Sequence, residues 1–419
     1  MTIKSIQDVK NLSGRLVFLR SDLNVPVKKG KVLDDFKIAA SLPTIEYLLK
    51  HNCRIIAASH LEPIGGEKNA SLKGVAKRLG ELLGGKVKFV PDCIGEKAEK
   101  EAEKLKPGEI ILLENLRMHK GEKGNDPEFA LALARLVLKS AGPKTKKVSS
   151  RPAGQASADG EPEARGIYVN DSFAVDHRNH ASVSAIKKFL PAYAGLLVEK
   201  EIENLEKIVR PEKPATAIIG GAKISTKIAL INSLLPKYES ILIGGAMANN
   251  FFAAQGLEVG KSLVSAEDVE LARKLIRQPA GKKIILPADV IVSAGKEKGE
   301  IRHCQIDKVK KNEYIFDIGP ETIRAYAKII KGAKTLMWNG PMGLFENPHF
   351  SQGSLSIARL VASRASGKAF AAVGGGETME VLERSKMKEY IDWASSGGGA
   401  MLSYLGGERM PGLEGLTGK

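Results

Sequence analysis

The sequence has few cysteines, few aromatic side chains and no long apolar run, and each shortage excludes a class of protein. Only three of its 419 residues are cysteines, Cys53, Cys93 and Cys304, and they form no C-x-x-C pair. This argues against a disulfide framework and a zinc site, and it favours a reducing compartment, so we expect a cytoplasmic protein. No apolar run approaches the roughly 18 residues of a membrane helix. We therefore expect no membrane association. The first residues also lack a hydrophobic signal region, so we expect that the protein is not secreted.

Acidic residues are outnumbered, with 48 Asp and Glu against 64 Lys and Arg, which leaves a net charge of +16. Such an excess attracts anions: nucleic acid, acidic membranes or phosphorylated metabolites. Aromatic residues make up only 5% of the chain, which is little for a protein that stacks bases on its surface. The lysines are spread along the chain rather than packed in one block, so a solvated basic surface is favoured over a nucleic-acid patch.

Short apolar, β-rich runs alternate with helical stretches, which is typical of α/β domains with largely parallel sheets. The runs are 16–19, 54–58, 87–90, 110–113 and 167–169, then 217–219, 241–243, 283–286, 335–338 and 369–373. Between the two sets, 196–209 has apolar residues at helical spacing, and Pro211 and Pro214 follow it. We predict two doubly wound (Rossmann-like) parallel-sheet domains, 1–195 and 196–404, joined by this helix and a hinge.

Residues 139–165 break the pattern, because they contain three Pro, three Gly and four Ser with almost no bulky apolar side chain. Such a segment cannot bury enough surface to offset its chain entropy, so we predict a flexible basic insertion. Its six Lys and Arg against three Asp and Glu give a net charge of +3. Nucleic-acid binding through this segment stays open, but that charge is too weak to carry tight binding alone.

Ligands of open α/β sheets bind beyond the carboxyl ends of the strands, so the residues after each run are the informative ones. In the first half these are mostly polar and basic: Arg20–Asn24, Ser59–His60, Glu114–His119, Asn170–Ser172 and His177–His180. Arginines and histidines converging at one sheet edge indicate a small, strongly anionic ligand, because a guanidinium holds phosphate or carboxylate in a bidentate manner.

In the second half, glycine clusters follow the strands, at 220–221, 244–245, 340–343, 374–376 and 397–399. Glycines before helices let backbone N–H groups approach phosphate oxygens at the positive helix end. Lys223 and Lys227 are four residues apart at a predicted helix start, so we expect both on one helix face. We interpret the second half of the chain as binding a nucleotide and the first half as binding an acidic substrate. This combination indicates an enzyme that transfers a phosphoryl group between the two.

These segments, taken in order, resemble the phosphoglycerate kinase family over nearly the whole chain. The matching motifs are RSDLNVP (20–26), DDFKIAASLPTI (34–45), SHL (59–61), ENLRMHKGE (114–122), NDSFAVDHRNHAS (170–182), GGAKIS (220–225), GGAMANNF (244–251), FDIGPETI (316–323), WNGPMGLFE (338–346), GGGET (374–378) and SSGGGA (395–400).

The resemblance implies reversible transfer of the acyl phosphate of 1,3-bisphosphoglycerate to MgADP, giving 3-phosphoglycerate and ATP, in glycolysis and gluconeogenesis. By motif match, the glycerate ligand would bind Asp22, Asn24, Lys37, His60, Arg117 and Arg178. The nucleotide would bind Gly220, Lys227, Asn339, Glu346, Gly375, Gly376, Glu377 and Thr378, with Mg²⁺ on Glu377. Catalysis would rest on Lys223, Lys37 and the backbone donors of Gly397, Gly398 and Gly399. The resemblance also implies a monomer of two lobes that close on a hinge, with the tail 405–419 packed on the first lobe.

Four positions depart from the family pattern. Lys37 replaces a catalytic arginine, and Ala246 replaces a glycine beside the expected adenine pocket. Glu377 replaces a metal-binding aspartate. The S-H-L-G-R-P motif is one residue shorter here, at 59–63, and has the carboxylate of Glu62 in place of its arginine. Changes at Lys37 and Glu62 weaken the expected glycerate site. A different class of protein therefore stays open, a catalytically impaired relative that serves as a nucleotide-binding scaffold.

Replacing residues 139–165 with a short Gly/Ser linker should change the thermal midpoint little, because the entropy of loop closure depends only weakly on length. Calorimetric melting of the two chains tests this expectation. A large loss of stability or activity would show that the segment is a structural element.

Overall fold

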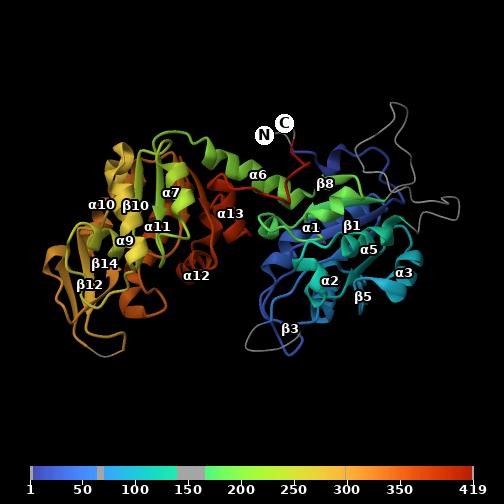
Figure 1. Ribbon diagram of the computed structural model, residues 1–419, viewed down its shortest axis with the longest axis horizontal. Helices are drawn as coiled ribbons and strands as arrows, with labels where there is room; N and C mark the ends of the chain where they lie inside the picture. The colour runs from blue at the N-terminus through green and yellow to red at the C-terminus, as the bar shows by residue number, and fades with distance from the viewer. Residues whose placement is uncertain (1–2, 64–69, 139–165, 298, 418–419) are drawn as a thin grey trace. The chain divides into compact units, whose positions relative to one another are not determined.

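A computed structural model describes residues 3–63, 70–138, 166–297 and 299–417 (Figure 1). The predicted flexible insertion at 139–165 lies outside the described residues. The contacts within the chain divide it into two units, one reaching to Ile202 and including the tail from Met410, the other spanning Glu203–Arg409. Among the described residues, no helix combines the length and the apolar character that crossing a membrane requires.

The first unit is built on a six-stranded sheet in which every pair of neighbouring strands is parallel. Its strand order is β5-β6-β4-β1-β7-β8. The strands are β1 (Leu16–Ser21), β4 (Arg54–Ala58), β5 (Lys88–Val90), β6 (Ile110–Leu113), β7 (Ile167–Asp171) and β8 (Ala192–Ala194). A hairpin of β2 (Val27–Lys28) and β3 (Lys31–Val32) and the short helix α4 (Lys120–Lys123) complete the unit.

Helices cover both faces of this sheet, because alternate strand residues point to opposite sides. Val17 and Leu19 pack on one side in a core that includes side chains of α1 (Phe36–Lys50) and α2 (Lys73–Leu83). Leu16 and Phe18 pack on the other side in a core with α3 (Gly95–Glu103) and α5 (Pro127–Leu138). The near-continuous apolar runs of the sequence reflect this burial on two faces.

The second unit repeats the plan with a parallel sheet of order β11-β10-β9-β15-β16-β17. Its strands are β9 (Ala215–Ile219), β10 (Ser240–Ile243), β11 (Ile284–Ile285), β15 (Thr335–Asn339), β16 (Phe370–Val373) and β17 (Trp393–Ala394). One core contains Trp338 and Val373 of the sheet with side chains of α10 (Pro320–Gly332), α11 (Gln352–Ala365) and α12 (Gly376–Ser385). The remaining helices contact one another in pairs: α7 (Ile228–Leu234) with α13 (Gly398–Leu405), and α8 (Met247–Ala254) with α9 (Ala266–Arg277).

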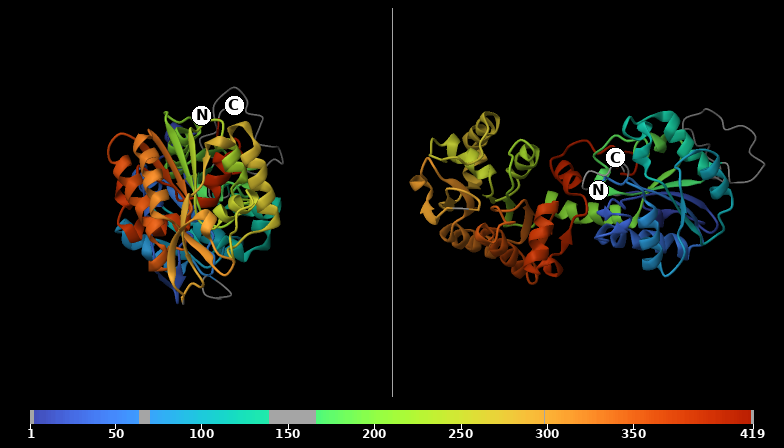
Figure 2. Two further views of the ribbon diagram at one scale, coloured as in Figure 1. Left: turned by 90° about the vertical axis from the view of Figure 1, so that its left-hand side faces the viewer. Right: turned by 90° about the horizontal axis from the view of Figure 1, so that it is seen from below.

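The predicted fold class is confirmed, since both sheets are parallel and every predicted apolar run overlaps a strand. The sequence analysis missed a three-stranded antiparallel sheet in the second unit (orange in Figure 2), of order β13-β12-β14. Its strands are β12 (Asp289–Ser293), β13 (Ile301–Gln305) and β14 (Tyr314–Ile318). β13 is mostly exposed and mixes charged and apolar residues, so no apolar run marks it.

Helix α6 (Leu196–Val209) lies where its apolar spacing predicts, and its start is fixed by side chains of the first unit. Asp171 Oδ1 accepts from Leu197 N–H at 2.9 Å, and Thr44 Oγ1 accepts from Leu196 N–H at 2.9 Å. Gly195 precedes the helix because a Cβ there would lie 2.2 Å from Asp171 Oδ1. Burial raises the pKa of Asp171 to about 7, so this cap depends on a tightly enclosed carboxyl group.

Both ends of the described chain lie in the first unit, side by side (Figure 2). Ile3 and Thr417 form an antiparallel bridge. The ammonium of the half-buried Lys187 donates to three tail carbonyls, those of Pro411 at 2.5 Å, Gly412 at 3.0 Å and Glu414 at 2.7 Å. The tail from Met410 is therefore held on the first unit by this cation together with backbone contacts to the start of the chain.

Gly195→Ala should destabilise the protein by about 1–3 kcal/mol, because the new methyl group overlaps the carboxyl that caps α6. Denaturant unfolding followed by circular dichroism measures the change. Gly332→Ala is the matched control, since a Cβ at this helical position meets no atom within 4 Å. Equal midpoints for the two variants would contradict the steric argument.

Candidate active site

Five of the six predicted glycerate residues of the first unit follow the carboxyl ends of strands in its sheet. Asp22 and Asn24 follow β1, and His60 follows β4. Arg117 lies in the 3₁₀ helix Leu116–Met118 after β6, and Arg178 follows β7 and the 3₁₀ helix Phe173–Val175. Lys37 lies in the first turn of α1 and its Nζ pairs with Asp22 Oδ2 at 2.8 Å.

His60 is held by a buried arginine that sequence reasoning placed at the strand end but did not assign to the site. Arg20 is fully buried, and its Nη2 lies 3.2 Å from His60 Nδ1. Burial, and then the charge of Arg20, lower the pKa of His60 well below its usual value. Because a guanidinium only donates, Nδ1 of the neutral ring accepts and Nε2 carries the proton. His60 therefore offers one N–H to an acceptor.

The buried positive charge of Arg20 is connected to the carboxylate of Glu122 through the hydroxyl group of Ser182. Arg20 Nε donates to Ser182 Oγ at 2.9 Å, and that hydroxyl donates to Glu122 Oε1 at 2.6 Å. Arg20 Nη1 also donates to Ser21 O at 2.6 Å and to Ser172 Oγ at 3.2 Å. A charged group removed from water must be paired and hydrogen-bonded, and this network meets both conditions.

Arg117 is buried with part of its guanidinium unsatisfied. Its side chain is 9% exposed, and its Nη1 pairs with Glu62. Within the described chain, Arg117 Nε and Nη2 are buried and have no hydrogen-bond partner. Buried cationic donors without acceptors are costly, so this edge favours an anionic ligand. Arg178 Nη1 lies 3.7 Å from the same Glu62 oxygen.

In the second unit the strand-end glycines allow backbone segments to touch. A Cβ on Gly220 would lie 2.0 Å from Pro341 O, and one on Gly245 would lie 2.5 Å from Gly221 N. The loops after β9, β10 and β15 thus pack directly on one another. Glycine is required at these positions for packing between loops, a reason that the sequence analysis did not foresee.

A different pair of glycine loops brings two helix N-termini together. Helix α12 starts at Gly376 and α13 at Gly398, and a Cβ on Gly398 would lie 3.0 Å from Gly375 Cα. The two helix N-termini are therefore side by side. Each presents backbone N–H groups and the positive end of a helix dipole, and open space lies beside Gly376.

Lys227 and Asn339 stand next to these helix starts. The Lys227 ammonium is buried and bonds to Asn339 Oδ1, while Asn339 Nδ2 donates to Gly374 O at 2.6 Å. Thr378 Oγ1 accepts from the N–H of Gly340 at 2.7 Å. Burial lowers the pKa of Lys227 to about 8, and the charge of nearby Glu377 partly opposes this. A phosphate placed here would compensate the buried cation.

The expectation that Lys223 and Lys227 share one helix face is wrong. Helix α7 begins only at Ile228, so Lys223 lies in the preceding turn. Lys227 has φ −126° and ψ 2°, which is not helical, and it stands at the cap position. As a consequence Lys223 is exposed while Lys227 is buried.

A cavity of about 350 Å³ opens beside these loops. Its walls are largely apolar and include Ala246, Phe252, Leu263, Tyr314 and Met342. Two of the predicted nucleotide residues, Glu346 and Glu377, are exposed carboxylates on its lining. An apolar slot with polar groups at its edge suits a flat ring that carries hydroxyl and phosphate groups.

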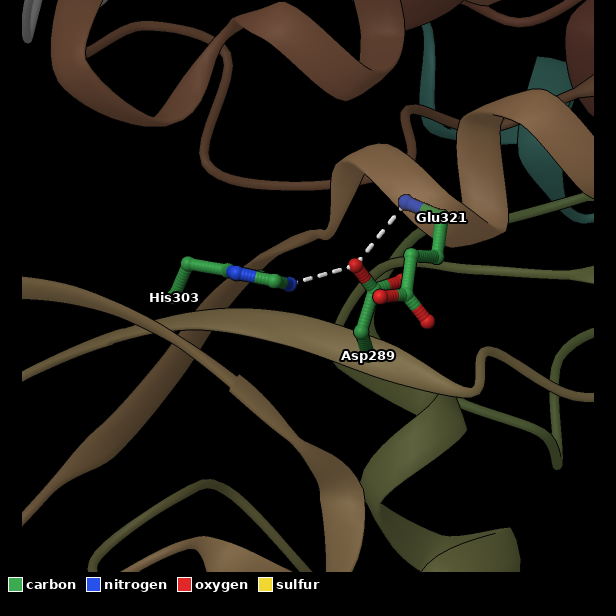
Figure 3. A group of neighbouring side chains, drawn as sticks. All are labelled: Asp289, His303 and Glu321. Atoms are coloured by element: carbon green, nitrogen blue, oxygen red, sulfur yellow. Dashed lines mark hydrogen bonds and ion pairs between the residues drawn. The ribbon is translucent and has the colours of Figure 1, made fainter.

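One cluster with metal-binding residue types serves the fold instead. Oxygen or nitrogen atoms of Asp289, His303 and Glu321 lie within 4.8 Å of one another (Figure 3). Asp289, however, accepts from His303 Nε2 at 2.6 Å and from the backbone N–H groups of Glu321 at 2.9 Å and Thr322 at 2.7 Å. Its oxygens are occupied by the start of α10, so the cluster is a helix cap.

Comparison with known proteins shows which family has this sequence and this fold. The phosphoglycerate kinase family profile matches residues 6–138 and 161–408. Phosphoglycerate kinase of Moorella thermoacetica is 43% identical over 100% of this chain and 99% of its own length, and that of Pelotomaculum thermopropionicum is 40% identical over all of both. The solved Coxiella burnetii enzyme covers 99% of this chain and 98% of its own, with a TM-score of 0.81 at 35% identity. Because profile, relatives and structure all extend over both sheets and their strand-end loops, the chain belongs to the phosphoglycerate kinase family.

Proposed function

We propose that this chain reversibly transfers the acyl phosphate of 1,3-bisphosphoglycerate to MgADP, giving 3-phosphoglycerate and ATP. The observation that carries the proposal is the pair of helix N-termini at Gly376 and Gly398 beside the buried cation of Lys227. Backbone donors and a fixed positive charge there suit a phosphoryl group. The family relationship supports the identity of the substrates.

We propose that the first unit binds the glycerate ligand. The unsatisfied edge of Arg117 and the exposed guanidinium of Arg178 would take anionic oxygens. The Nε2–H of His60 would donate to a further oxygen. Asp22 would accept from a hydroxyl group and, through its ion pair, hold the Lys37 ammonium near the acyl phosphate. Asn24 would complete the polar lining.

The second unit, in this proposal, binds the nucleotide. The base would enter the apolar cavity, with Glu346 on the ribose and Gly220, Lys227, Asn339, Gly375, Gly376 and Thr378 along the phosphates. The exposed Glu377 carboxylate, in the first turn of α12, fits the one or two protein carboxylates that Mg²⁺ usually takes beside a nucleotide. The ion would neutralise phosphate charge.

The reaction requires no covalent bond between the protein and the phosphoryl group. A terminal phosphate oxygen of ADP forms the new P–O bond while the bond from phosphorus to the acyl oxygen breaks, and the carboxylate leaves without a proton. The need is for charge stabilisation on the phosphoryl group in transit. Lys223 is exposed and free to move to that group, and Gly397, Gly398 and Gly399 would add backbone donors.

The compartment, assembly and domain boundaries also remain proposals. We infer a cytoplasmic monomer, in keeping with three buried free thiols, of which Cys53 has its pKa raised to about 11 by burial. The boundaries 195/196 and 404/405 would mark the glycerate and nucleotide domains and the returning tail, and hinge closure would exclude water.

The scaffold alternative is favoured by one observation: the two arginines of the glycerate site already pair with Glu62. A coupled assay of ATP formation from 1,3-bisphosphoglycerate decides between the two functions. Turnover that requires Mg²⁺ would establish the kinase. Its absence at saturating substrates, also in Lys37→Arg, would leave the scaffold.

Arg117→Ala should raise the KM for the acid substrate by roughly 10- to 150-fold, the scale of a lost charged hydrogen bond. Arg178→Ala should have a smaller effect, because Arg178 is far more exposed than Arg117. The KM for the nucleotide should hardly change in either variant. Steady-state kinetics measure both KM values, and Arg135→Ala on α5 is the control. Equal changes in the KM values for the two substrates would show that the arginines lie outside the glycerate site.

Lys223→Ala should lower kcat by about 10²- to 10³-fold, as does loss of one donor that acts in the transition state. ADP affinity should be nearly kept, because the exposed ammonium is not needed to hold the nucleotide. Kinetics and equilibrium ADP binding measure the two effects. The control is Lys328→Ala, an exposed lysine on α10. A variant with full kcat but weak ADP binding would reverse the assigned role.

A further inference from the structure

The carboxylate of Glu62 pairs with two of the predicted glycerate residues, Arg117 and Arg178. Its side chain is 51% exposed, and Oε1 pairs with Nη1 of the buried Arg117 and lies 3.7 Å from Nη1 of Arg178. One carboxylate oxygen of Glu62 is thus the partner of both arginines, and these are the arginines that we propose bind the substrate.

The backbone of Glu62 is fixed by a third residue of the same site. Asn24 Oδ1 accepts from Glu62 N–H at 2.8 Å. Asn24 follows β1, whereas Glu62 follows β4, so this bond joins two neighbouring strand-end loops. It fixes the backbone of Glu62 at this edge, and the side chain reaches the arginines from that fixed position.

Glu62 carries the charge and the two-oxygen geometry that an arginine pair selects in a ligand. The hydrogen bond from Arg117 lowers the pKa of Glu62 below its usual value, so the group is ionised at neutral pH. An incoming anion that uses Arg117 Nη1 must displace this carboxylate. The Nε and Nη2 edge of Arg117, in contrast, is unpaired within the described chain.

We propose that Glu62 is a built-in carboxylate competitor that occupies the two arginines until the phosphoglycerate displaces it. This inference rests on the proposed function, because it concerns the same site. Glu62 sets the affinity for the acid substrate: it weakens binding of 3-phosphoglycerate and speeds its release. It also keeps Arg117 paired while the site holds no ligand.

A merely structural ion pair would behave differently. If Glu62 only positioned the arginines, its removal would let them move and would weaken substrate binding. If it competes, its removal raises affinity. The two roles therefore predict opposite signs for the same measurement.

The test is titration calorimetry of 3-phosphoglycerate into the wild type, Glu62→Gln and Glu81→Gln. Glutamine keeps the shape of Glu62 and removes its charge. Glu81 is the matched control, since it is a partly exposed glutamate that pairs with Arg78 at 3.0 Å on α2. We expect Glu62→Gln to bind about 3- to 10-fold more tightly, the range of an ion pair with one exposed partner, and Glu81→Gln to bind as the wild type does.

A double variant shows whether the tighter binding of 3-phosphoglycerate in Glu62→Gln depends on Arg117. In Arg117→Ala, the further change Glu62→Gln should tighten binding less than twofold, because the principal partner of the carboxylate is gone. KM for 3-phosphoglycerate should follow the binding constant, whereas KM for ATP should stay unchanged. A full gain in the Arg117→Ala background would overturn the assignment of Arg117 as the contested group.

The inference is overturned if Glu62→Gln binds 3-phosphoglycerate no more tightly than the wild type. It is also overturned if neither protein binds 3-phosphoglycerate. If the wild type forms ATP at a normal rate while Glu62→Gln binds no more tightly, this inference fails and the proposed function stands. If ATP formation is missing but Glu62→Gln binds 3-phosphoglycerate more tightly, the proposed reaction fails and the competitor role stands.

Discussion

Burial of parallel strands on both faces is the constraint on which the rest of the structure depends. A strand such as β1 has helices above and below it, so its polar groups can leave the core only at its ends. At the carboxyl ends the chain turns into helices through short loops, and these loops carry Asp22 and His60 in one unit and the glycine clusters in the other. The position of both sites therefore follows from how the sheets bury their apolar residues.

Arg20 in the first unit and Lys227 in the second are buried cations at that edge, and their charges are balanced in different ways. Arg20 is satisfied inside the protein, through Ser182 and Glu122, so its charge positions His60 and needs no ligand. Among the described residues, the Lys227 ammonium bonds to the side-chain and backbone oxygens of Asn339 and is influenced by the charge of nearby Glu377, and burial lowers its pKa to about 8. An internal network suits a positioning role, while an incompletely balanced cation suits a group that binds phosphate.

The sequence predicted both sheets and the strand-end location of the site residues, because periodic apolar runs and motif order are local signals. It could not place Lys223 and Lys227 correctly, since the start of α7 depends on how the loops after β9 and β15 pack. The sheet of β12, β13 and β14 was not predicted, although β12 and β14 contain short apolar runs, because their partner β13 is mostly exposed and mixes charged and apolar residues. The pairing of Glu62 with Arg117 joins residues 55 positions apart, and only the folded chain shows it.

The glycerate site and the whole protein differ in their electrostatics. Relative to the family motif, the loop after β4 has lost one arginine and gained Glu62, so the local charge is more negative by two units, while the chain as a whole carries +16. Long-range attraction of an anion depends on the total field and acts on the association rate. The pairing at Arg117 acts at contact and therefore on dissociation. If Glu62 competes for Arg117 as proposed, a basic protein with a partly neutralised site would combine fast capture of its acidic substrate with fast release.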